Sequence, residues 1–138
     1  MVLMEDQQLR ITSRSENITL VEKLIEDVCE VYRVSEDHYG NILVALTEAV
    51  NNAIIHGNKC NPEKTIDIAF TSKEDCIVFI VKDQGEGFDF DNLPDPTDPE
   101  NIEKPNGRGV FLMRNLADKV EFSDNGCTVA LNFRISAN

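Results

Sequence analysis

Residues 46–57 read Leu-Thr-Glu-Ala-Val-Asn-Asn-Ala-Ile-Ile-His-Gly, and this stretch decides which fold the chain is expected to adopt. At about 100° per residue, the apolar side chains here and just before fall on one side of a helix, as in a helix that faces a core. They are Tyr39, Ile42, Leu43, Leu46, Val50, Ala53 and Ile54. The opposite side carries Asn41, Glu48, Asn52 and His56. The pattern predicts one long amphipathic helix that Ser35 can cap and Gly57 can end, the latter in a left-handed conformation.

Glu48 and Asn52 are four residues apart, so their side chains stack one turn apart on the same face of that helix. Both offer oxygen atoms, and Mg²⁺ is usually held by one or two protein oxygens together with phosphates and water. A carboxylate one turn away can accept a proton from an attacking hydroxyl. Because most polar helix faces only contact solvent, the pair by itself fits a solvated face as well as a site.

The rest of the chain alternates between strand and helix patterns. Strands are predicted over 8–12, 65–71, 76–81, 119–123 and 127–135, and helices over about 15–33, 35–57 and 109–117. Short polar turns at 73–75 and 124–126 predict two hairpins. The order β-α-α-β-β-α-β-β predicts an α+β two-layer sandwich, a mostly antiparallel mixed sheet with three helices on one face. A length of 138 residues without repeats favours a single domain over 1–138.

Composition excludes several classes of function. A formal net charge of −12 argues against a nucleic-acid partner, which needs a basic surface. No apolar run reaches roughly 18 residues, so no membrane span is expected. The N-terminus does not resemble a secretory signal, and the four cysteines (29, 60, 76 and 127) form no Cys-x-x-Cys pair. These features favour a reducing cytoplasm and disfavour a zinc site.

A second motif, Asp83-Gln-Gly-Glu-Gly87, follows the strand predicted to end near Val81. An aspartate at a strand end can accept a hydrogen bond from an exocyclic amine, and glycines let a planar ligand approach the backbone. The same residues also suit a plain turn. They do not form an EF-hand loop, because the sixth position is Phe88 where that loop requires glycine.

A third motif, Gly107-Arg108-Gly109, precedes the helix predicted from Gly109. Glycines at a helix N-terminus expose backbone N–H groups that suit phosphate oxygens. Arg108 and Lys104 add positive charge to an acidic segment. The chain has no Rossmann fingerprint, which needs a third glycine in a βαβ unit, and no P-loop.

The order of these motifs resembles a known nucleotide-binding fold. Glu-x-x-x-Asn-Ala on a helix, Asp-x-Gly-x-Gly after a strand, Gly-x-Gly at a helix and Gly-Cys-Thr (126–128) on a last strand are similar to the Bergerat-type fold of histidine kinases, Hsp90, gyrase and MutL. Residues 48–58 and 107–122 look like the anti-sigma factor serine kinases of bacterial partner-switching systems. The resemblance extends from about residue 8 to residue 135.

The resemblance implies a cytoplasmic protein serine/threonine kinase that uses ATP and Mg²⁺. It implies that Asn52 binds Mg²⁺ and that Glu48 is the catalytic base. The partners it implies are a sigma factor and a small anti-anti-sigma (STAS-type) antagonist, whose serine accepts the phosphoryl group, and relatives are often homodimers. One alternative is an ATP-sensing anti-sigma binding module without phosphotransfer. Another is the catalytic fragment of a histidine kinase, which is disfavoured because no helical pair with an acceptor histidine precedes the predicted domain.

By the same resemblance, Asp83 recognises the adenine amino group, Gly85 and Gly87 shape that wall, and Thr128 lies near adenine. His56 follows the family pattern without an evident chemical role, so it is interpreted as a helix-end residue.

The resemblance implies that Gly107 and Gly109 lie beside the phosphates. It also implies that residues 88–106 form the lid over ATP. Relatives often carry an arginine in the lid near the γ-phosphate. Here Lys104 and Arg108 are the candidate cations.

Overall fold

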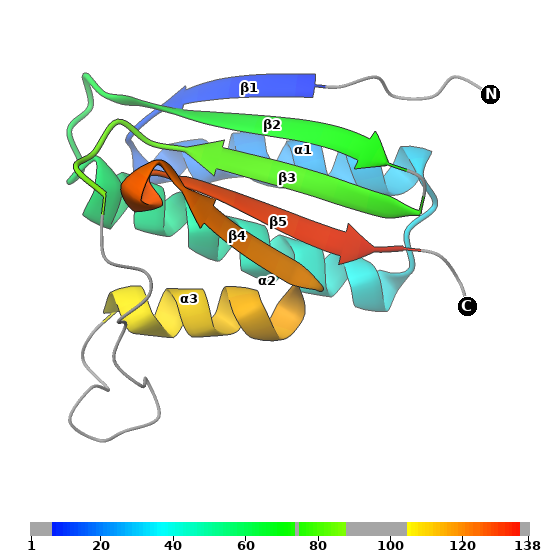
Figure 1. The fold of residues 1–138 in the computed structure, drawn as a ribbon. Helices are drawn as coiled ribbons and strands as arrows, with labels where there is room; N and C mark the ends of the chain where they lie inside the picture. The colour runs from blue at the N-terminus through cyan, green and yellow to red at the C-terminus, as the bar shows by residue number, and fades with distance from the viewer. Residues whose placement is uncertain (1–6, 74, 88–104, 136–138) are drawn as a thin grey trace.

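The protein is described by a computed structural model over residues 7–73, 75–87 and 105–135, and of 105–108 only the backbone is described. It has two layers, a five-stranded sheet and helices packed on one face of it (Figure 1). The strands are β1 (Gln7–Thr12), β2 (Thr65–Lys73), β3 (Cys76–Lys82), β4 (Lys119–Ser123) and β5 (Thr128–Arg134). The helices are α1 (Ile18–Val31), α2 (Glu36–Asn52) and α3 (Pro105–Leu116). The predicted α+β sandwich is therefore confirmed.

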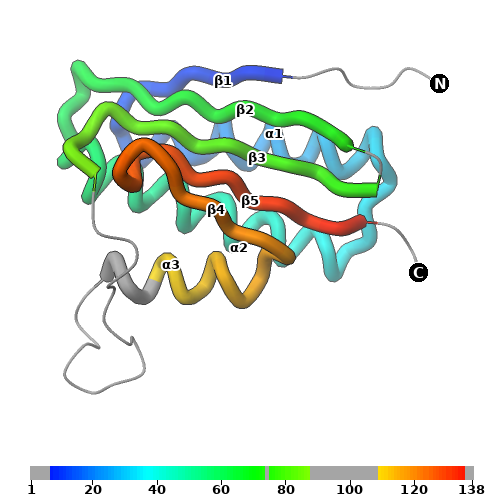
Figure 2. The backbone as a smooth tube through the Cα atoms, in the orientation of Figure 1, coloured from blue at the N-terminus to red at the C-terminus, as the bar shows by residue number. Residues whose placement is uncertain are grey.

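The strand order is β1-β2-β3-β5-β4, and each described pair of neighbours is antiparallel. In register, one row of side chains crosses the whole sheet. It runs Leu9, Ile68, Val81, Val129, Phe122. Because side chains alternate between the two faces of a strand, the whole row faces the helices. The trace in Figure 2 shows β3, β4 and β5 side by side where the row ends.

Helix α2 lies at the centre of the helical layer, beside both α1 and α3 (Figure 1). The apolar face that the sequence predicts is confirmed: Ile42, Leu46, Val50 and Ile54 are all at most 2% exposed. Ser35 caps the helix by accepting a hydrogen bond from the backbone N–H of His38 at 3.2 Å. Burial of this face positions the polar side of α2 next to α3.

Two details differ from the expectation. Helix α3 begins at Pro105 rather than at Gly109, so Gly107 and Gly109 lie within the helix and not before it. Proline suits the first position of a helix, because its missing N–H would have no partner there. The long helix also changes character after Asn52, since Ala53–Gly57 forms a wider π-helical turn. Among the helices that the structure describes, none combines the length and apolar character needed to cross a membrane.

Candidate nucleotide-binding site

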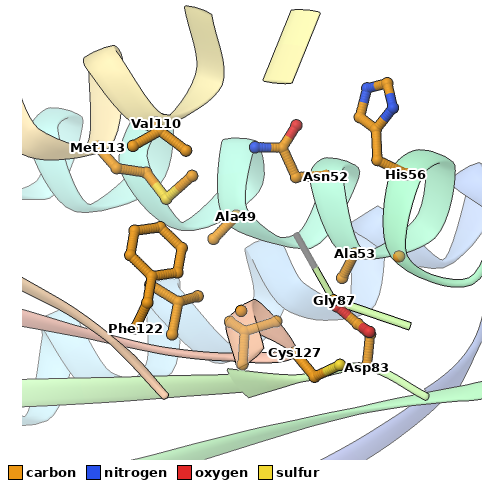
Figure 3. Close-up of a pocket in the computed structure, with 14 residues that line it drawn as sticks. Ala49, Asn52, Ala53, His56, Asp83, Gly87, Val110, Met113, Phe122 and Cys127 are labelled. Carbon is orange, nitrogen blue, oxygen red and sulfur yellow. The ribbon is translucent and has the colours of Figure 1, made fainter. Parts of the chain in front are cut away.

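A pocket opens between α2, α3 and one end of the sheet, and it contains about 590 Å³ of free space including its open mouth (Figure 3). The described residues that line it are Ala49, Asn52, Ala53, His56, Gly57, Val81, Asp83, Gly87, Val110, Met113, Phe122, Gly126, Cys127 and Val129. The pocket thus unites the first two sequence motifs with residues of α3.

The walls of the pocket are apolar. Val81, Val129 and Phe122 are neighbours in the row that crosses the sheet, and they form one wall. Val110 and Met113 of α3, 2% and 1% exposed, line it from the helical layer. Planar ring systems bind well between such apolar surfaces.

Asp83 is the one carboxylate among the described lining residues, and it lies directly after β3. Its Oδ1 accepts a hydrogen bond from the backbone N–H of Gly85 at 2.8 Å. Burial raises the pKa of Asp83, while the Gly85 N–H, the thiol of Cys127 and the charge of Lys64 act in the opposite direction. A half-buried carboxylate with free lone pairs can accept a hydrogen bond from a ligand amine.

Gly57 packs directly against this carboxylate. A Cβ at Gly57 would lie 2.5 Å from the Asp83 Cγ, and one at Gly85 would overlap the carbonyl oxygen of Gly57. The expected left-handed conformation at Gly57 is wrong, because the described glycines with positive φ are Gly87 and Gly126. Gly57 is needed for close approach, not for an unusual backbone angle.

Gly87 closes the pocket at the β4–β5 turn. Its φ is +86°, and a Cβ there would overlap the carbonyl oxygen of Asn125 in that turn. Left-handed angles at Asp124 and Asn125 (φ 52° and 58°) bring the turn to this position. Glycine is therefore required at position 87 both by the backbone angle and by the lack of space for a side chain.

Asn58 anchors the Asp83 loop from behind and is only 1% exposed. Its amide donates to Ser13 Oγ at 2.7 Å and to the Thr65 carbonyl at 3.0 Å, and its Oδ1 accepts from the Gln84 N–H at 2.8 Å. The sequence does not reveal this role, because nothing in the pattern of residues distinguishes a buried asparagine after a helix from an exposed one. The network fixes the residue next to Asp83.

Asn52 and Glu48 are placed differently. The Asn52 side chain lines the pocket on the side away from Asp83 (Figure 3). It also contacts α3, since a Cβ at Gly109 would lie 2.6 Å from its Nδ2. Glu48 lies one turn earlier on α2, is half-buried, and is not one of the described lining residues. Of the predicted pair, the structure brings only Asn52 into the pocket.

His56 lines the pocket one turn beyond Asn52, so it is more than the helix-end residue that the sequence suggests. The π-helical turn is held by the Asn58 N–H, which donates to the Ala53 carbonyl at 2.8 Å. Burial lowers the pKa of His56, which favours the neutral imidazole. π-helical turns inside longer helices are frequent at functional sites.

The other residues predicted for the site lie around the pocket or outside the residues that the structure describes. Gly109 is buried against Asn52. Gly107 and Arg108 lie in the first turn of α3, where backbone N–H groups have no partner within the helix. The predicted helix start at Gly109 is therefore wrong. Thr128 begins β5, and its hydroxyl donates to Asp124 Oδ2 at 2.8 Å. Lys104 and positions 88–104 of the expected lid lie outside the described residues.

The fold and the pocket define a class of protein. A model of the histidine kinase-like ATPase domain matches residues 11–133, and the chain belongs to this family. The serine-protein kinase RsbW of Staphylococcus epidermidis is 30% identical over 132 residues, which cover 90% of this chain and 83% of that protein. The RsbW of Staphylococcus aureus is 28% identical over the same shares. These relatives place the chain in the anti-sigma factor kinase family, as the resemblance predicts.

A solved structure agrees with the fold. It contains the RsbU and RsbW domains of a Mycobacterium tuberculosis protein and matches with a TM-score of 0.67 at 14% identity. The match covers 98% of this chain but only 34% of the other, so this chain spans about a third of that protein.

Proposed function

We propose that the chain is a Mg²⁺-ATP-dependent serine kinase that binds a sigma factor and phosphorylates a serine of an anti-anti-sigma (STAS-type) antagonist. One observation carries the proposal: the apolar pocket has a carboxylate, Asp83, on one side and an oxygen ligand, Asn52, on the other. A nucleotide needs both, an acceptor for the base and a group that holds the metal on its phosphates.

The adenine ring would lie between Val81 and Val129 on the sheet and Met113 on α3. Its exocyclic amine would donate to the carboxylate of Asp83. Gly87 and the β4–β5 turn would border the ring. The absence of a side chain at Gly57 leaves the Asp83 carboxylate the space it occupies.

The triphosphate would extend toward Asn52 and the first turn of α3. Within the described part of the chain, no three His, Cys, Asp or Glu side chains gather as a metal site. A single asparagine oxygen still fits Mg²⁺, because this ion takes most of its ligands from phosphates and water. When bound, Mg²⁺ would neutralise charge on the phosphates. The N–H groups of Gly107 and Arg108 would hold phosphate oxygens, with the side chain of Arg108 or Lys104 as the cation.

Glu48 would orient and deprotonate the acceptor serine. In the transfer, the serine oxygen bonds to the γ-phosphorus, the bond from that phosphorus to the ADP oxygen breaks, and the serine proton passes to the carboxylate. General-base catalysis of this kind contributes about 10²–10⁴-fold. Glu48 lies on the face of α2 that carries Asn52, one turn away, so it would meet a protein substrate at the pocket mouth.

A second function is a switch module that binds ATP and a sigma factor without transferring phosphate. It is favoured by the position of Glu48 beside the pocket rather than among its described lining residues. In either case the chain would act as a homodimer, with ATP favouring the sigma-bound state.

The test is a transfer assay with radiolabelled ATP, Mg²⁺ and STAS-type antagonists from the same genome, together with a calorimetric titration of ATP. The expected result is ATP binding and label on one antagonist serine, lost when that serine is replaced by alanine. ATP binding without label on any antagonist would favour the switch module. Failure to bind ATP would exclude both functions.

A further inference from the structure

Three hydrogen bonds join Asp83, Gly85 and Cys127 into a closed ring beside the pocket. The Asp83 N–H donates to the Cys127 carbonyl at 2.9 Å, and the Gly85 N–H donates to Asp83 Oδ1 at 2.8 Å. The Cys127 thiol closes the ring by donating to the Gly85 carbonyl at 3.1 Å, and it also interacts with the Asp83 carboxylate, whose pKa it lowers. Figure 3 shows the sulfur of Cys127 next to the Asp83 carboxylate.

We propose that Cys127 is a positioning residue that sets the selectivity of the pocket for a purine with an exocyclic amine, acting through Gly85 and Asp83. This inference rests on the proposed ATP site. Cys127 is the link in the ring that comes from the β4–β5 turn, directly before β5, whereas Asp83 and Gly85 belong to the segment after β3. The thiol therefore ties the acceptor carboxylate to the opposite strand end.

The surroundings keep the thiol protonated, as donation requires. Burial and the neighbouring carboxylates of Asp83 and Asp124 raise the pKa of Cys127, and Lys82 opposes them only partly. A thiolate could not donate to the Gly85 carbonyl. The thiol is thus a stable hydrogen-bond donor at neutral pH.

Removing the donor affects one part of the ligand more than another. The Gly85 carbonyl would lose a partner, and the loop that aims Asp83 would gain freedom. Contacts of the apolar walls with the rings would remain, because Val81, Val129 and Met113 are not in the ring of hydrogen bonds. The loss of binding free energy should therefore come from the hydrogen bond between the exocyclic amine and Asp83. Hydrogen bonding depends on direction, whereas apolar contact does not.

The experiment compares ATP with purine riboside triphosphate, which lacks the 6-amino group, by calorimetric titration at neutral pH. We expect the wild-type chain to prefer ATP by about 5- to 150-fold, the range for one hydrogen bond to a buried group. In Cys127→Ala this preference should fall by about 3- to 10-fold, while the affinity for the analogue changes less than about twofold. Cys127→Ser, which keeps a donor, should recover most of the preference.

The matched control is Cys60→Ala, because Cys60 is an exposed thiol and is not one of the described lining residues. It should bind both nucleotides like the wild type. Cys127→Val, which lacks the donor but fills the space, replaces Cys127→Ala if alanine weakens folding. A wild-type chain that prefers ATP and a donor-less variant with the same preference would overturn the positioning role alone. Equal weakening of both nucleotides would do the same, and a wild-type chain that binds neither would overturn the proposed function.

Discussion

Single residues carry the two ends of the candidate site. Asp83 accepts one backbone hydrogen bond and keeps further lone pairs for a ligand, while Asn52 presents a neutral oxygen on the far side of the pocket. Between them lie hydrocarbon walls and close backbone contacts. Substitutions at these two residues should therefore affect different parts of a nucleotide.

Asp83→Asn should weaken ATP binding by about 5- to 150-fold, because one buried hydrogen-bonding partner is removed or misdirected. Folding should survive: burial already raises the pKa of Asp83, so the charge is unfavourable in the folded state and a neutral amide removes that cost. Calorimetry measures the affinity and thermal melting measures the fold. Asp67→Asn is the control, since Asp67 is paired with Arg10 on the surface. Unchanged affinity in Asp83→Asn would remove this residue from the adenine site.

Glu48→Gln and Asn52→Ala should differ in which step they impair, ATP binding or phosphoryl transfer. Asn52→Ala removes the proposed metal ligand, so Mg²⁺-dependent ATP binding and transfer should both fall. Glu48→Gln keeps size and hydrogen bonding but not the base, so ATP should bind at least as well while transfer drops by about two orders of magnitude or more. A single-turnover transfer assay beside a binding titration separates the two. Transfer at the wild-type rate by Glu48→Gln would leave only positioning as the mechanism.

At the scale of elements, the contact between α2 and α3 determines the shape of the pocket. Gly109 allows α3 to lie directly against Asn52, and Val110 then reaches the pocket wall. The sequence predicts this glycine at a free helix N-terminus, whereas the structure places it inside α3 against Asn52. The start at Pro105 could not be deduced, because two glycines in a short segment favour a loop over a helix.

Gly109→Ala tests this contact. The new Cβ would lie 2.6 Å from Asn52 Nδ2, so either the amide or α3 must move. We expect weaker Mg²⁺-ATP binding, about tenfold, although alanine favours helix more than glycine by about 1 kcal/mol. Gly40→Ala on α2 is the control, since its Cβ would meet nothing within 4 Å. It should raise the free energy of unfolding by about 0.5–1 kcal/mol and leave binding unchanged. Identical affinities in both variants would show that the contact is irrelevant to the site.

For the whole molecule, the architecture could be predicted because helix and strand periods are clear and the hairpins are short. The apolar face of α2 and all five strands follow from side-chain spacing. The pocket walls could not be predicted in this way, because Val110, Met113 and Phe122 look like ordinary core residues until the space between α3 and the sheet is known. Asn58 and Cys127 were missed for a related reason: their partners, Ser13 and Gly85, are distant in sequence.

Binding should also be visible in the stability of the whole chain. A ligand that binds only the folded state stabilises it by about 2.7 kcal/mol at 100 times its Kd. Mg²⁺-ATP at that concentration should raise the Tm by several degrees, roughly 2–8 °C for a chain of this size. At the same nucleotide concentration the shift should shrink in Asp83→Asn. An unchanged Tm in the wild type at saturating ATP would contradict binding to this pocket.

The π-helical turn at Ala53–Gly57 has a consequence for insertions and deletions. Such a turn holds one more residue than an α-helical turn. Inserting a further residue there could not be absorbed by the turn and would rotate everything beyond it by about 100°. Gly57 would then leave the Asp83 carboxylate, and Asn58 would lose its place behind Gln84. Deleting a single residue would instead convert the turn into a regular α-helical one, with Asn58 still bonded to Ala53. The site should therefore tolerate a one-residue deletion between Asn52 and Asn58 but no insertion there.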